Sequence, residues 1–151
     1  MDAVIQEFKE SKSVGIPMNS VDPEFLEDDT YTCIQLYNYD GWFCQANDAF
    51  PLTCKFLKDK FGTSIRQAFF ATMHGPKFLA PHRNTDTESK SLRYHLGVDV
   101  HKDCDGVLKV GKQVYKWEEG VDFVFDTKKT HSVYKSSDYR RTILVVDFIA
   151  K

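Results

Sequence analysis

The sequence lacks several features that would assign it to a familiar class of protein. It has no apolar run approaching the roughly 20 residues that span a bilayer, and its start does not pair a basic segment with an apolar one. With 20 Lys and Arg against 22 Asp and Glu, it also lacks the basic excess typical of nucleic-acid binders. We therefore expect a cytoplasmic protein without a membrane or nucleic-acid partner.

Cysteine is scarce as well. The four cysteines are Cys33, Cys44, Cys54 and Cys104, and no two of them form a C-x-x-C pair. This spacing argues against a structural zinc site. Two disulfides are arithmetically possible, but the expected location favours reduced thiols.

What the sequence does contain is enough apolar material for one folded unit. Its 151 residues suit a single domain, and 42% of them are hydrophobic. Aromatic residues reach 14%, which favours strands. We predict one domain over residues 1–151, with a supporting segment over 1–46 and a β core over 47–151. We expect a monomer or a weak homodimer.

The periodicity of apolar residues predicts one or two helices followed by many strands. Residues 2–10 have mild helical character, and 51–61 form the best helix, with Asn47 or Asp48 as its cap and Gly62 at its end. Residues 31–46 resemble a hairpin. The later strand candidates are Arg66–Met73, Phe78–His82, Ser91–Val100, Val107–Val110, Val114–Trp117, Val121–Phe125, His131–Tyr134 and Thr142–Ile149. Short, closely spaced strands of this kind predict a mainly β sandwich or jelly roll.

One predicted strand carries polar residues in alternation. Within residues 91–100, Arg93, His95, Gly97 and Asp99 share one face, while the opposite face is apolar. A solvent-facing outer surface is the ordinary explanation. The alternative is a face that points between two sheets toward a ligand, with Gly97 leaving space for its approach.

Two further histidines stand at strand ends. If the last two strands form a hairpin centred on Ser136, His131 and Arg141 lie opposite each other, where one could bind a metal ion and the other a carboxylate. An incidental surface pair is an equal alternative. His82 follows Pro81 at the end of another strand. Spacing alone does not select the ligands among the five histidines, which are His74, His82, His95, His101 and His131.

Several motifs together resemble the aspartyl/asparaginyl β-hydroxylase family over roughly residues 47–149. The matching blocks are Pro81-His82, R-Y-H-L-G-V at 93–98, W-E-E-G at 117–120, Phe125-Asp126, His131-Ser132-Val133 and Arg141 with Asp147. Their order and spacing are specific. The resemblance implies a double-stranded β-helix, which is a cupin-like jelly roll.

The same resemblance implies an oxygenase that depends on Fe(II), 2-oxoglutarate and O₂. Two positions, His82 and His131, match the family's iron ligands, and Arg141 matches the arginine that anchors the distal carboxylate of 2-oxoglutarate. Arg93 and His95 match a pair that faces the cosubstrate. The chemistry is consistent, because a bidentate arginine suits a carboxylate and neutral imidazoles leave open positions on iron.

Three positions depart from the usual pattern. Asn84 stands where many such oxygenases have a third, carboxylate ligand, although this family often lacks it and Asp86 is close. Ala71 replaces a serine used near the cosubstrate, with Thr72 adjacent, and Thr127 replaces an acidic residue before His131.

These features predict a dioxygenase that hydroxylates an amino acid, a peptide or another small substrate. One alternative is a non-catalytic module of the same fold that binds 2-oxoglutarate or a metal. Another is a cupin-like metal enzyme that uses some of His74, His82, His95 and His131 without 2-oxoglutarate. Arg141 argues against the latter, because such an enzyme needs no carboxylate anchor.

Overall fold

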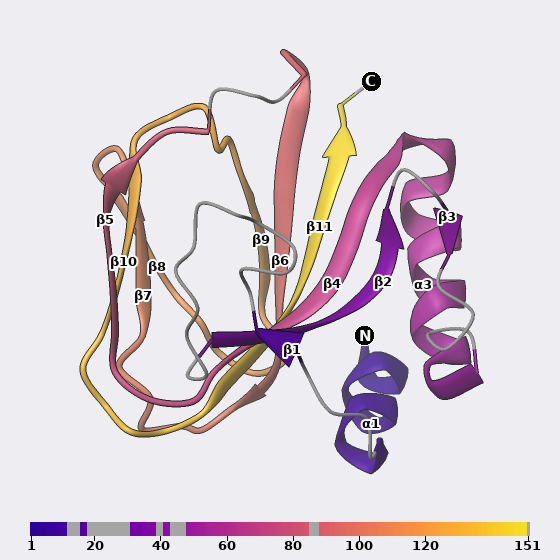
Figure 1. The fold of residues 1–151 in the computed structure, drawn as a ribbon, viewed down its shortest axis with the longest axis horizontal. Helices are drawn as coiled ribbons and strands as arrows, with labels where there is room; N and C mark the ends of the chain where they lie inside the picture. Colours follow the sequence, from indigo (N-terminus) through magenta and orange to yellow (C-terminus); the bar gives the residue numbers. More distant parts are fainter. Residues whose placement is uncertain (12–15, 18–30, 39–40, 43–47, 85–87, 151) are drawn as a thin grey trace.

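Two antiparallel sheets face each other, and two helices cover the outer side of the larger sheet (Figure 1). The computed structural model describes residues 1–11, 16–17, 31–38, 41–42, 48–84 and 88–150. The helical elements are α1 (Asp2–Glu10), α3 (Pro51–Phe61) and the 3-10 turn η2 (Gly62–Ser64). The predicted mainly β jelly roll with N-terminal helices is confirmed.

The larger sheet has seven strands in the order β1-β2-β4-β11-β6-β9, with β3 paired to β2. Its strands are β1 (Ile16–Pro17), β2 (Tyr31–Asn38), β3 (Gly41–Trp42), β4 (Ile65–Met73), β6 (Ser91–Val100), β9 (Asp122–Phe125) and β11 (Arg141–Ile149). The smaller sheet has the order β5-β10-β7-β8. Its strands are β5 (Lys77–His82), β7 (Val107–Val110), β8 (Gln113–Lys116) and β10 (His131–Lys135). Every strand predicted after residue 65 is present, with ends that move by at most one residue.

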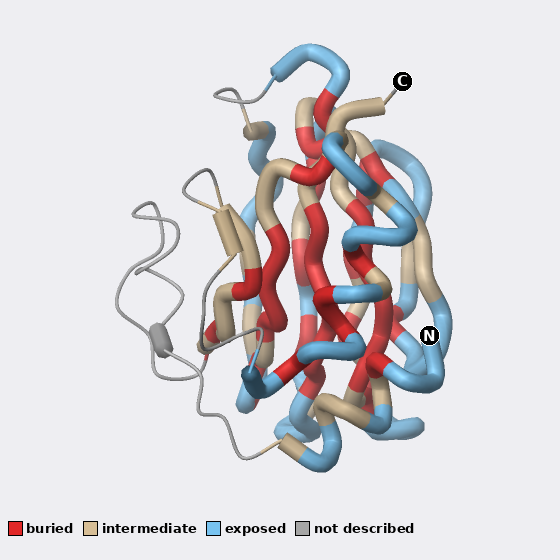
Figure 2. The backbone as a smooth tube through the Cα atoms, turned by 90° about the vertical axis from the view of Figure 1, so that its right-hand side faces the viewer, coloured by how far each residue is buried: buried red, intermediate tan, exposed pale blue. Residues whose placement is uncertain are grey.

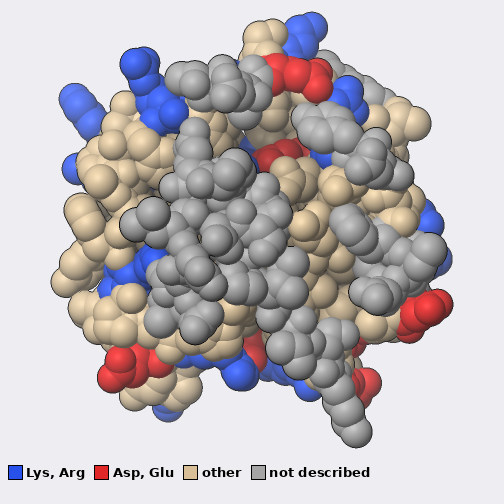
Figure 3. Space-filling model, in the orientation of Figure 1, with Lys and Arg blue, Asp and Glu red and all other residues tan. Residues whose placement is uncertain are grey.

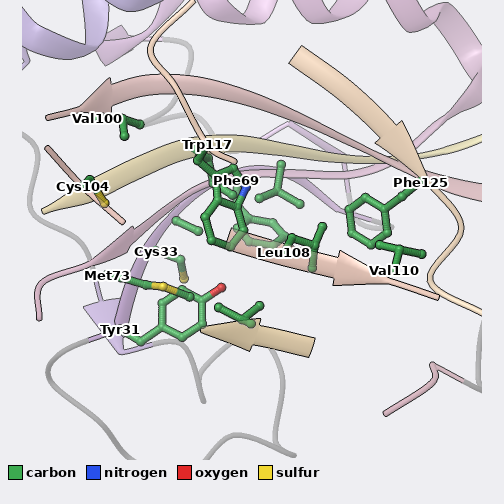
Figure 4. Close-up of a cluster of buried hydrophobic side chains, with 14 residues drawn as sticks. Tyr31, Cys33, Phe69, Met73, Val100, Cys104, Leu108, Val110, Trp117 and Phe125 are labelled. Atoms are coloured by element: carbon green, nitrogen blue, oxygen red, sulfur yellow. The ribbon is translucent and has the colours of Figure 1, made fainter. Parts of the chain in front are cut away.

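Two layers of buried side chains hold these elements together. Figure 2 shows that the buried residues lie along the central parts of the strands. One layer fills the space between the sheets and includes Phe69, Trp117 and Val145 (Figure 4). The other lies between the larger sheet and the helices and includes Leu57 and Leu144. Successive residues of β11 alternate between the two layers, as the two-residue period of a strand requires.

The helix α3 is capped from a distance. Its N-cap residue, Phe50, makes no side-chain capping bond. Instead, the carboxylate of Glu7 in α1 accepts the backbone N–H groups of Leu52 (2.7 Å) and Thr53 (2.8 Å) and the hydroxyl of Thr53 (2.7 Å). The predicted cap at Asp48 is therefore wrong, and Asn47 lies outside the described residues. An acidic group at this end is also favoured by the helix dipole.

Replacing Glu7 by alanine is expected to destabilise the fold by about 1–2 kcal/mol, because two helix N–H groups lose their acceptor. Urea unfolding measures this difference. Glu10→Ala is the matched control, because Glu10 contacts only exposed Gln6 among the hydrogen bonds of the described residues. Equal stability of the two variants would contradict the capping role.

The polar face of β6 ends earlier than its alternation predicts. The register between β6 and β11 shifts where Thr142 pairs with Asp99 and Ile143 pairs with Gly97. As a result, Val100 lies in the layer between the sheets. Asp99 turns to the outer side, where Arg140 donates to its carboxylate at 2.8 Å. The predicted placement of Asp99 beside His95, and of Val100 on the opposite face, is therefore wrong.

Gly97 does face the space between the sheets, but the protein's own backbone fills the space beside it. A Cβ added at Gly97 would collide with the Glu118 carbonyl group, whose carbon would lie 2.6 Å away. The amide of Gly97 donates to Val121 (3.1 Å), and its carbonyl accepts from Gly120 (2.9 Å). The prediction that a ligand approaches at Gly97 is wrong.

Candidate functional site

His82 and His131 lie side by side at neighbouring strand ends. The register of β5 and β10 pairs them directly, and their ring centroids are 4.3 Å apart. In each ring Nδ1 lies 2.8 Å from a backbone carbonyl oxygen, that of Ala80 for His82 and that of Lys129 for His131. A carbonyl only accepts, so Nδ1 carries the proton and Nε2 keeps its lone pair. Both imidazoles therefore hold the tautomer that binds a metal through Nε2.

The surroundings of His131 favour its neutral form. Only 5% of the residue is exposed, and Phe125 packs edge-on against its ring. Burial lowers the pKa of His131, and the nearby His82 and Arg93 lower it further against the opposing effect of the Lys129 carbonyl. The second histidine, His82, is exposed. One imidazole thus lies in the interior and the other at its rim.

A backbone bond links the segments that carry the two histidines. The amide of Asn84, two residues after His82, donates to the carbonyl of buried Thr127 at 2.9 Å.

Within the described ranges no cluster of three or more His, Cys, Asp or Glu side chains is formed. Asp126 accepts from the side chain and the amide of Lys128. Asp86 lies outside the described residues.

Arg141 is buried between the sheets with a charge that no acidic group of the described residues balances. Only 1% of it is exposed. Its Nη2 donates to the Ala71 carbonyl at 3.3 Å, and its Nε has no hydrogen-bond partner. Burial lowers the pKa of Arg141, while Tyr31 acts in the opposite direction. A guanidinium stays charged in proteins, so this one is suited to an anionic ligand.

His131 and Arg141 do not face each other across a hairpin. They belong to opposite layers, because β10 pairs with β5 and β7 whereas β11 pairs with β4 and β6 (Figure 1). The chain descends along β10 from His131 and returns along β11 from Arg141, so the two residues start from opposite ends of the sandwich. The predicted opposition is wrong.

His95 lies on the inner face of β6, as predicted. It is 6% exposed and is surrounded by the rings of Phe123 and Phe125. The indole Nε1–H of Trp117 donates to its Nδ1 at 3.1 Å. Burial lowers the pKa of His95 well below its usual range, and the charges of Arg93 and Arg141 and the neighbouring His131 add to this. The imidazole is therefore neutral, with its proton on Nε2.

Arg93 shares the inner face with His95 but is matched by an acid. Its Nε and Nη2 donate to the two carboxylate oxygens of Asp147 at 2.7 and 2.9 Å. The strand pairing of Arg93 with Asp147 across β6 and β11 builds this bidentate contact. Of the two arginines predicted to hold the cosubstrate, only Arg141 therefore presents an uncompensated charge.

Sequence similarity to known proteins extends over most of the chain. A family model described as aspartyl/asparaginyl beta-hydroxylase matches residues 4–151. The chain belongs to this family. One relative is the ornithine lipid ester-linked acyl 2-hydroxylase of Rhizobium tropici, 34% identical over 86 residues that cover 56% of this chain and 30% of that protein. Another is the aspartyl/asparaginyl beta-hydroxylase of Mus musculus, 31% identical over 102 residues that cover 64% of this chain and 13% of that protein.

Solved structures support the fold of this β-hydroxylase-family chain. It resembles a cupin domain of an XRE-family transcriptional regulator from Enterobacter cloacae, with a TM-score of 0.53, 9% identity and coverage of 82% of this chain and 100% of the other. It also resembles a predicted oxalate decarboxylase from Thermotoga maritima, with a TM-score of 0.50, 10% identity and coverage of 94% and 96%. The chain spans less than a third of the length of the two relatives described above.

The departures from the family pattern have structural counterparts. Ala71, which replaces a serine, is fully buried between the sheets. Its neighbour Thr72 points to the outer side and shares a hydrogen bond with Thr142 at 2.8 Å. Thr72 therefore cannot take the place of that serine inside the sandwich.

Sequence reasoning missed two contributors to the site, Trp117 and Asp147. Both stand in blocks of the family resemblance, but neither received a role. Their partners, His95 and Arg93, lie 22 and 54 residues away along the chain. A motif match could mark these residues as interesting, but only the strand register shows what they contact.

In the view of Figure 3, both basic and acidic side chains of the described residues lie around the periphery, and several basic groups gather at the upper left. No helix in the described part of the chain is both long and apolar enough to cross a membrane.

Proposed function

We propose that this chain is an Fe(II)- and 2-oxoglutarate-dependent dioxygenase that hydroxylates an amino acid, a peptide or another small substrate. The observation that carries the proposal is Arg141, a buried guanidinium with an unpartnered Nε and no acidic partner among the described residues. It lies inside the same sandwich as two histidines whose Nε2 lone pairs are available. A metal site and a carboxylate anchor within one sandwich suit a chelating dicarboxylic acid.

Each residue has a defined task in this proposal. His82 and His131 would hold Fe(II), their rings oriented by the carbonyls of Ala80 and Lys129. Bound Fe(II) would supply the activation of O₂. Arg141 would bind the distal carboxylate of 2-oxoglutarate through its Nε and Nη groups. His95 would donate an Nε2–H hydrogen bond to the cosubstrate. The ion pair of Arg93 with Asp147 would border the same space.

The substrate class is proposed from the names of the relatives and from the charges in the interior. The names of the relatives mention an ornithine lipid acyl group and aspartyl or asparaginyl residues. Two buried cations of the described residues form no ion pair, Arg141 and Lys135. The cosubstrate would use Arg141, whereas the ammonium of Lys135 donates to the carbonyls of Gly75 and Ser137. A small substrate, free or within a peptide, needs no further cation. The cytoplasmic location and the monomeric or weakly dimeric state stay predictions.

A non-catalytic binding module of the same fold is the second candidate. It is favoured by the two-histidine site, because no third His, Cys, Asp or Glu joins the pair within the described residues. The two candidates differ in the fate of 2-oxoglutarate under O₂, since only an oxygenase converts it to succinate.

The test is anaerobic addition of Fe(II) and 2-oxoglutarate, followed by exposure to O₂. A weak visible charge-transfer band before O₂ and succinate afterwards are the expected results. A band without succinate, across a panel of amino acids and peptides, would favour the binding module. If neither the band nor succinate appears, both readings are refuted.

Arg141→Leu is expected to weaken 2-oxoglutarate binding by about 100-fold, because two charge-assisted hydrogen bonds are lost. Calorimetric titration of 2-oxoglutarate into the Fe(II)-loaded chain measures the change. Arg140→Leu is the control, since Arg140 is on the outer side and bonds to Asp99. Unchanged affinity in Arg141→Leu would contradict the proposed anchor.

A further inference from the structure

The W-E-E-G block and β6 interlock through their backbones. Gly97 donates to Val121 and accepts from Gly120, and it forms an isolated parallel bridge with Glu119. The absence of a side chain at Gly97 lets the Glu118 carbonyl group pass against β6. These contacts fix the backbone that immediately follows Trp117, so the position of the indole is set by main-chain bonds.

The indole ring of Trp117 is also fixed by close packing on its surroundings. The residue is 2% exposed and lies in the layer between the sheets, beside Phe69 in Figure 4. A Cβ at Gly106 would lie 3.1 Å from Cε3 of the indole, which shows how closely the backbone of the 101–106 segment packs on the ring. Such a ring has little freedom to turn away from its contacts.

Two of the proposed cosubstrate residues contact this one side chain. The indole N–H donates to Nδ1 of His95 at 3.1 Å. The Cζ atom of Arg141 lies 4.4 Å from the centroid of the Trp117 ring, within the range of a cation–π contact. Trp117 therefore touches the hydrogen-bond donor and the cation at the same time.

We propose that Trp117 is a positioning residue, which fixes the tautomer of His95 and the orientation of Arg141 so that both direct N–H groups at an anionic ligand between the sheets. This inference rests on the proposed function for the identity of that ligand, 2-oxoglutarate. The tautomer part does not depend on it.

The hydrogen-bond donor of Trp117 determines the tautomer of His95. An indole N–H only donates, so Nδ1 of His95 must accept and the proton of the neutral ring must sit on Nε2. Without this bond the two tautomers of a buried neutral imidazole compete, and in one of them Nε2 presents a lone pair to the ligand. A carboxylate would then meet an acceptor instead of a donor.

The decisive measurement is the tautomer of His95 in the full chain. Two-bond ¹H–¹⁵N spectra at mildly alkaline pH are expected to show a protonated Nε2 and a bare Nδ1. Trp117→Phe keeps an aromatic face but removes the N–H, so a mixture of tautomers is expected. Trp42→Phe is the control, because Trp42 packs against Tyr37 and Lys58 on the outer side. A single unchanged tautomer in Trp117→Phe would overturn the proposal.

Binding of 2-oxoglutarate to the Fe(II)-loaded chain under argon separates the two contacts. Trp117→Phe is expected to weaken binding about three- to tenfold, the effect of one neutral hydrogen bond. Trp117→Leu also removes the ring face and should weaken it about fivefold more. That further loss should vanish in an Arg141→Leu background, and its persistence there would refute the Arg141 contact. If wild type binds no 2-oxoglutarate, the proposed function fails while the spectra still decide the tautomer.

Discussion

Replacing His131 by alanine is expected to abolish Fe(II) binding, because it leaves His82 as a single imidazole at the rim. One histidine does not hold a divalent iron at micromolar concentration, and no third His, Cys, Asp or Glu of the described residues joins His82 and His131 in a group that could hold a metal. Anaerobic equilibrium dialysis with Fe(II), read by metal analysis, measures the loss. The charge-transfer band with 2-oxoglutarate should disappear with it.

His131 is buried, so its removal also leaves a cavity that could disturb the fold. His82→Ala avoids this difficulty, because His82 is exposed and its loss leaves the interior intact. We expect it to abolish iron binding with an unchanged melting temperature. His101→Ala, which removes an exposed ring stacked on Tyr139, should bind iron as the wild type does. Full iron occupancy in either site variant would refute that ligand.

The strands and most of their facings could be predicted because period-two alternation is a local property of the sequence. It correctly placed Arg93 and His95 on the inner face of β6. It failed at Asp99, because the shift in register that turns this residue outward depends on how β6 meets β11, where Asp99 pairs with Thr142, 43 residues later. Alternation predicts which residues share a face only as far as the strand stays regular.

The false hairpin between His131 and Arg141 has a similar cause. The stretch Ser136–Asp138 has the composition of a tight turn, and nothing local distinguishes a hairpin from a crossing between sheets. In the structure, the Asp105 carboxylate accepts the amides of Ser136 (3.1 Å) and Ser137 (3.0 Å), and the buried Lys135 donates to the Ser137 carbonyl (2.6 Å). Contacts with a segment 31 residues earlier thus direct the chain into the other layer.

The candidate metal pair needed more than the residues themselves. Five histidines offered no internal reason to select His82 and His131, and the family resemblance made the selection. The register then brings those two rings together and gives both the same tautomer. By contrast, His74 shares a hydrogen bond with Thr32 at a site lined by outer-side residues, and His101 is exposed. Neither could join the pair.

Gly97→Ala is expected to destabilise the fold by about 3 kcal/mol or more, among the largest effects of any single methyl group in this chain. The added carbon would collide with the carbonyl group of Glu118, which is backbone and cannot rotate away. Relief by a shift of the segment would break the bonds of Gly97 with Gly120 and Val121. It would also move Trp117, so any folded fraction should bind 2-oxoglutarate more weakly.

Gly75→Ala provides the matched control, because a Cβ at Gly75 meets no atom of the described residues within 4 Å and its φ is not positive. Urea unfolding of the two variants, followed by tryptophan fluorescence, compares the same chemical change at a crowded and an open position. We expect Gly75→Ala to stay within about 0.5 kcal/mol of the wild type. If Gly97→Ala were equally stable, β6 and the W-E-E-G block would not interlock, and the backbone placement of Trp117 would lose its support.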